Sequence, residues 1–132
     1  MIRRNVFAAV AVACCVAVVG SAFAQAGGGA KATVPVRIKN VGQSSVRVNA
    51  ASGAGLSAAA LKSGSKTVSR NGVAQFLVRK GNFTAVAANP SNYNGVNSVR
   101  GFSTGNFKTY YLQAQATNTA ASIVGAPPGV KF

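Results

Sequence analysis

Short segments in which apolar and polar residues alternate recur through most of the chain, separated by Gly, Asn and Ser. In residues 33–39, for example, Val34, Val36 and Ile38 alternate with a proline, an arginine and a lysine. Alternate residues of a strand share one face, so this spacing is typical of a half-buried strand. No later segment keeps apolar residues at the 3.6-residue spacing of an amphipathic helix. The pattern therefore predicts an all-β fold with short strands.

About seven strands are expected, at residues 33–39, 45–50, 66–69, 73–79, 82–88, 96–102 and 108–116. Asn71-Gly72 is a dipeptide that hairpin turns favour, and Lys80-Gly81 predicts a second tight turn. We therefore expect the three central strands to follow one another as hairpins. Residues 51–61 fit either a loop with a short helical turn or a weak strand. Residues 117–132, which contain Pro-Pro-Gly, predict a loose C-terminal tail.

The first 26 residues have the layout of a secretory signal peptide. Two arginines precede an apolar run, and small residues then offer cleavage after Ala24 or Ala26. The apolar run is shorter than the ~20 residues that a membrane-spanning helix needs. We therefore expect a periplasmic or secreted protein in which residues 27–32 are a flexible lead-in to a single domain.

A second processing route involves Cys14. Val12-Ala13-Cys14 loosely resembles a bacterial lipoprotein box, in which Cys14 would carry the lipid. The usual Leu is replaced by Ala11, however, and the apolar run continues past Cys15. If cleavage follows the ordinary signal, both cysteines leave with the leader. The mature chain would then have no thiol for a disulfide, a nucleophile or a metal site.

Acidic side chains and histidine are absent from the whole chain, which carries 14 Lys plus Arg and a formal net charge of +14. General acid/base catalysis at neutral pH draws chiefly on His, Asp and Glu. Mg²⁺ and Ca²⁺ sites need carboxylate oxygens, and catalytic Zn²⁺ sites need His, Cys or carboxylate ligands. We therefore expect no enzyme, no cofactor and no metal site.

The uncompensated positive charge predicts attraction to polyanions, because no internal salt bridge absorbs any of it. The candidate polyanion-binding residues are Arg37, Lys39, Arg47, Lys66, Arg70, Arg79, Lys80, Arg100 and Lys108. The cations of residues 33–39 and 45–50 would line one face if those two strands pair. The four cations of residues 66–80 would gather near the central hairpin.

The expected partners are an anionic polymer or envelope surface: lipopolysaccharide, acidic polysaccharide or extracellular DNA. Aromatic residues that would stack on sugars or bases beside the cations are Tyr93, Phe102, Phe107, Tyr110 and Tyr111. Adjacent strand residues point to opposite faces, so one of Tyr110 and Tyr111 should face the core. The alternative functions are a structural or adhesive subunit that self-assembles or docks to an envelope partner, and a cationic toxin or inhibitor.

Residues 67–88 resemble the core of carboxypeptidase-regulatory-like and Cna-B-type domains. The resemblance rests on a Thr-containing strand, the Asn-Gly turn, and Phe76, Gly81 and Phe83 at the positions where that pattern has an aromatic strand, a glycine and an aromatic-led strand. With the flanking strands it extends over residues 33–116. It implies a small single-domain antiparallel sandwich of about seven strands, immunoglobulin-like or transthyretin-like. It also implies a role as a spacer, stalk or folding module. The Lys–Asn crosslink of some Cna-B domains needs a buried acid, so we do not expect that crosslink here.

Overall fold

The computed structural model describes residues 32–132. The predicted leader, Cys14 and nearly all of the lead-in lie outside these residues. The described elements are β1 (Thr33–Asn40), β2 (Val46–Ser52), α2 (Ala58–Lys62), β3 (Lys66–Val68), β4 (Val73–Arg79), β5 (Asn82–Ala88), β6 (Asn97–Ser103), β7 (Tyr110–Ala116) and β8 (Ala121–Gly125). The all-β prediction is confirmed. Within residues 32–132, no helix is long and apolar enough to cross a bilayer.

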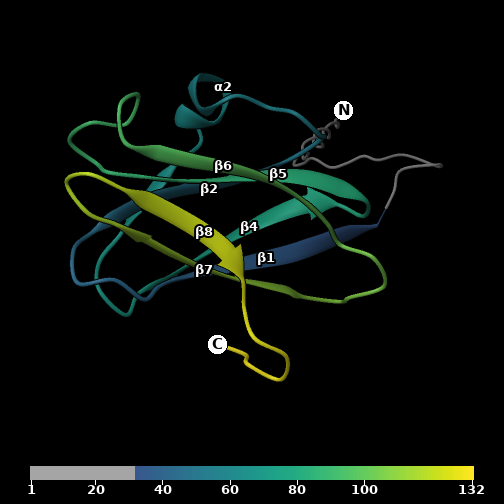
Figure 1. Ribbon diagram of the computed structural model, residues 1–132. Coiled ribbons are helices and arrows are strands. Elements are labelled where there is room, and N and C mark those ends of the chain that lie inside the picture. Colours follow the sequence, from purple (N-terminus) through teal and green to yellow (C-terminus); the bar gives the residue numbers. More distant parts are fainter. Residues whose placement is uncertain (1–31) are drawn as a thin grey trace, which may run out of the picture. The chain divides into compact units, whose positions relative to one another are not determined.

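The strands form two four-stranded sheets that lie face to face as a small β-sandwich (Figure 1). The first sheet has the order β4-β1-β7-β8, and the second sheet has the order β3-β2-β5-β6. Neighbouring strands are antiparallel except for the parallel pair β1 and β7. Each sheet therefore has two central strands and two edge strands.

The core lies between the sheets and is built from alternate strand residues. Val36 and Ile38 of β1 and Val46 and Val48 of β2 are fully buried there. Phe83 is the largest fully buried side chain among the described residues, with aromatic rings of the neighbouring strands around it. Burying a side chain of this size stabilises the fold by roughly 1.5–3 kcal/mol. Because Val and Ala supply most of the remaining core, the packing depends on close contact between the sheets rather than on a few large residues.

A second, smaller apolar cluster lies on the outer side of the second sheet, where α2 covers it (Figure 1). Leu61 of the helix packs with Val86 and Tyr93. The helix begins because the Ser57 side chain accepts a hydrogen bond from the backbone of Ala60, as an N-cap residue does. The ambiguous residues 51–61 thus hold the end of β2 and a short helix.

The prediction that the three central strands form hairpins is wrong, although all seven expected strands are present. β3 pairs with β2, β4 pairs with β1, and β5 pairs with β2 and β6, so each turn carries the chain from one sheet to the other. Both turns contain a residue with positive φ, +64° at Asn71 and +124° at Gly81, but Gly72 has no positive φ, so the Asn-Gly turn is not the two-residue type that hairpins favour. Turn residues fix the local reversal of the chain. Here they do not fix pairing, because the apolar faces of β4 and β5 cover the core from opposite sides.

The C-terminal residues are not a loose tail throughout. Ala121–Gly125 form β8, which pairs antiparallel with β7 and extends the first sheet. Ile123 is fully buried in the core. The compact unit runs from Thr33 to Phe132, beyond the end at residue 116 that the sequence suggested. The pattern at 121–125 is weak because only Ile123 is both large and buried.

Candidate anion-binding surface

Three of the candidate cations share the outer face of the first sheet. Arg37 and Lys39 alternate with the buried residues of β1, and Arg79 lies opposite Thr33 at the end of β4. Arg47 occupies the outer face of the second sheet. The prediction that the cations of β1 and β2 share one face is therefore wrong, because the two strands belong to different sheets.

Two other candidates lie on the core side of edge strands. Lys66 is in register with the buried Val48, and its Nζ donates to the backbone oxygen of Gln75 in β4 at 3.2 Å. The same ammonium lies 5.0 Å from the ring centroid of Phe76. It therefore bridges the β3 edge of one sheet to the β4 edge of the other.

Arg100 makes the equivalent bridge on the other side of the sandwich. Its register partner is the buried Ala85, and its guanidinium donates to the backbone oxygen of Ile123 in β8 at 3.3 Å. It also lies 5.4 Å from the ring centroid of Phe102. Long cationic side chains can cover apolar surface in this way while the charged group stays near water. Lys66 and Arg100 thus close the two open sides of the sandwich.

The expected gathering of cations around the central hairpin does not form. Arg70 lies in the turn before β4, whereas Arg79 and Lys80 lie at its far end. The seven residues of β4 separate them by about 20 Å. All three side chains are exposed, so they contribute to the general positive field rather than to one binding site.

On the outer face of the second sheet, two cationic side chains lie near the ring of Tyr93. The charged groups of Arg47 and Lys62 lie 5.6 and 5.9 Å from its ring centroid. Arg47 also donates to the Ser65 hydroxyl at 2.6 Å. The Tyr93 hydroxyl is buried and has no hydrogen-bond partner among the described residues. Burial raises the pKa of Tyr93, and the nearby Arg47 partly opposes that rise.

The chain beyond β8 returns to the outer face of the first sheet. The backbone N–H of Ala126 donates to the backbone oxygen of Tyr111 at 2.9 Å. The Phe132 ring packs edge-on against the Tyr111 ring, with 5.1 Å between the ring centroids. Arg37 Nε donates to the main-chain oxygen of Phe132. The Lys39 ammonium lies 5.9 Å from the Phe132 ring centroid. Residues 126–132 thereby join the two cations of β1 to the start of β7.

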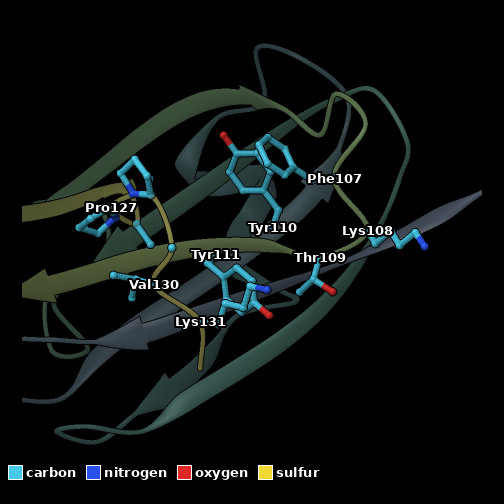
Figure 2. A pocket seen from close by; sticks show the side chains of 12 residues that line it. Phe107, Lys108, Thr109, Tyr110, Tyr111, Pro127, Val130 and Lys131 are labelled. Atoms are coloured by element: carbon cyan, nitrogen blue, oxygen red, sulfur yellow. The ribbon is translucent and has the colours of Figure 1, made fainter.

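A pocket of about 520 Å³ lies between residues 107–111 and residues 125–131. Figure 2 shows the rings of Phe107 and Tyr110 side by side, with Pro127 on the facing segment and the Lys108 side chain extending outward. Lys131 completes the basic part of the lining. We define the basic patch as Arg37, Lys39, Lys108 and Lys131. Lys131 was not among the sequence candidates, because only the return of residues 126–132 to this face brings it there.

Three of the five candidate aromatic residues line this pocket or adjoin its opening. The Tyr110 ring contacts Phe83 in the core, and Tyr111 faces outward against Phe132, which confirms the prediction that the pair divides between faces. Phe107 is 65% exposed. Tyr93, at 4% exposure, and Phe102, packed against the core, are poorly placed to stack on a ligand.

The pocket and patch offer ammonium and guanidinium groups and aromatic faces. This chemistry suits binding of an anion that also has an apolar face. The chain matches no family model, and no curated protein or solved structure matches it either. The resemblance to carboxypeptidase-regulatory-like and Cna-B-type domains therefore stays a prediction.

Proposed function

We propose that this protein is an exported, non-enzymatic β-sandwich that binds anionic polymers or anionic surfaces through its positive charge. The observation that carries the proposal is the basic patch, in a chain without any Asp or Glu: Lys108 and Lys131 line an aromatic pocket, and Arg37 and Lys39 contact Phe132 beside it. No acidic side chain reduces the field of these groups, so a polyanion is attracted over a distance comparable to the Debye length.

Export follows from the predicted signal peptide, and it selects the partners that the protein would meet. These are lipopolysaccharide, acidic polysaccharide and extracellular DNA. Each presents closely spaced negative charges whose counterions are released when the cations bind. Affinity that arises this way weakens steeply as salt is added.

Retention on immobilised heparin and immobilised DNA in a rising NaCl gradient tests the proposal. A fourfold patch variant (R37Q/K39Q/K108Q/K131Q) is compared with a control variant that loses four cations away from the outer face of the first sheet (R47Q/K62Q/R70Q/K80Q). Both variants have a net charge lowered by four, so a uniform field predicts equal losses of retention. We expect the patch variant to elute at lower salt than the control variant. A wild-type chain that passes through both columns at low ionic strength would refute the proposal.

A second function, assembly with another copy or with an envelope partner, is favoured by the edge strand β4. Leu77 is 64% exposed and Val73 is 37% exposed on this strand, which among the described strands has a neighbour on one side only. A further strand can pair with this edge by displacing the Lys66 ammonium from the backbone oxygen of Gln75. Large particles in size-exclusion chromatography that become monomeric with Leu77→Lys would support assembly. A monomeric wild-type chain at high concentration would exclude self-assembly.

A further inference from the structure

We propose that the pocket between residues 107–111 and 125–131 binds a uronic acid ring of an acidic polysaccharide. The inference rests on the proposed function and assigns it a ligand class and a site. The pocket volume of about 520 Å³ lies within the range of small-molecule sites, which is roughly 300–1,000 Å³. Such a pocket accommodates a sugar ring and part of its neighbour.

The apolar part of the lining fits the flat faces of a pyranose ring. Phe107 supplies an exposed ring, held edge-on by Tyr110 with their centroids 5.8 Å apart. Tyr110 is in turn fixed by its core contact with Phe83, 5.3 Å between centroids. The stacking platform is therefore supported from the core. Pro127 and Pro128 form the facing wall, and proline has little conformational freedom to lose on binding.

The basic part of the lining selects a charged sugar over a neutral one. Lys131 lines the pocket, and Lys108 extends outward from it (Figure 2). A uronate carries its carboxylate directly on the ring, so the ring stacks while the carboxylate meets an ammonium group. In a polymer, the next uronate is then within reach of the second lysine. Arg37 and Lys39 continue the positive surface past Phe132 for further residues of the polymer.

The aromatic arrangement favours a sugar polymer over single-stranded nucleic acid. Sequence-independent binding of single strands uses several aromatic platforms on which successive bases stack. Among the described residues that line this pocket, Phe107 is the one aromatic residue with most of its surface exposed. Tyr110 is tied to the core, and Tyr111 is covered by Phe132.

The test is a ¹H–¹⁵N NMR titration of the full chain with trigalacturonate, following the backbone amides of Gly125 and Gly129 in the pocket lining. The fully methyl-esterified trisaccharide is the matched neutral ligand. We expect the acid to shift both amides and the ester to bind at least fivefold more weakly. Phe107→Ala should raise the dissociation constant roughly tenfold, the scale of losing one stacking partner. Lys108→Gln should raise it about threefold, and Lys80→Gln less than twofold.

Several results would overturn the inference. Equal binding of the acid and the ester would show that charge is not selected. An unchanged dissociation constant with Phe107→Ala, or shifts confined to the Arg70 and Lys80 turns, would exclude the pocket. Tighter binding of an oligothymidylate at the same two amides would make the ligand a nucleic acid. If the pocket amides fail to respond while the chain is retained on heparin, this inference fails and the proposed function stands. If the chain binds trigalacturonate in the pocket but is retained on no polyanion column, the pocket assignment stands and the proposed function fails.

Discussion

Asn40 is a polar residue with no exposed surface, and it joins three parts of the fold. Its side-chain nitrogen donates to the backbone oxygens of Ser44 at 2.8 Å and Val68 at 2.9 Å. Its side-chain oxygen accepts from the backbone N–H of Gly42 at 2.9 Å. The amide thus uses both donors and its acceptor to hold the end of β1 against the second sheet.

Replacement of Asn40 by Ala should lower the free energy of unfolding by about 2–4 kcal/mol, because it leaves buried backbone groups without partners. Asn94→Ala is the matched control, since Asn94 is exposed. It should change stability by less than about 0.5 kcal/mol. Urea unfolding followed by circular dichroism measures both. Equal stability of the two variants would show that the Asn40 network does not hold the fold.

The buried hydroxyl of Tyr93 should make the free energy of unfolding depend on pH in the alkaline range. Burial raises the pKa of its hydroxyl in the folded state, with Arg47 opposing the rise. The unfolded chain therefore loses this proton at a lower pH than the folded chain does. The stabilising contribution of the neutral hydroxyl is complete below the ordinary Tyr pKa of about 10 and is lost as pH rises through the folded-state pKa.

Tyr93→Phe removes this titration and also removes a buried hydroxyl that has no hydrogen-bond partner within residues 32–132. We expect the variant to be at least as stable as wild type at pH 7. Its stability should also fall less than that of wild type between pH 9 and about pH 11. Thermal unfolding across this range measures the difference. A steeper alkaline decline in the variant than in wild type would contradict the assigned direction of the pKa shift.

β8 is the element that differs most from the sequence prediction, because it forms where a loose tail was expected. Ile123 is fully buried, whereas Val124 is 41% exposed on the opposite face. Ile123→Ala should lower the free energy of unfolding by about 2–4 kcal/mol, through lost burial and a residual cavity. Val124→Ala should cost less than about 1 kcal/mol. Near-equal, small costs in chemical denaturation would indicate that residues 121–125 do not pack as a strand.

Alternation in the sequence predicts β1, β2, β4 and β7 most clearly, because each of them presents apolar residues to one side at every second position. It could not predict pairing. The Asn71-Gly72 turn is compatible with a hairpin, and only the packing of β4 on β1 and of β5 on β2 shows that the chain changes sheets there. For the same reason, the faces on which Arg37 and Arg47 lie could not be assigned from sequence.

At the scale of the whole molecule, net charge was readable from composition, but the local arrangement of the cations was not. Lys66 and Arg100 look like any other strand cations in the sequence. The structure places them across the open sides of the sandwich, where neutral backbone oxygens accept their hydrogen bonds. Lys131 was not a sequence candidate, yet tertiary contacts of the C-terminal residues bring it into the lining of the pocket.

The proposed function depends on binding of polyanions by cations that no acidic side chain neutralises, above all those of the basic patch. The most direct measurement is the dissociation constant for heparin over a range of NaCl concentrations, for wild type and for R37Q/K39Q/K108Q/K131Q. We expect log Kd to rise linearly with log salt concentration for wild type, and to rise with a shallower slope for the variant because fewer counterions are released. A dissociation constant that is independent of salt, or identical slopes for the two proteins, would contradict it.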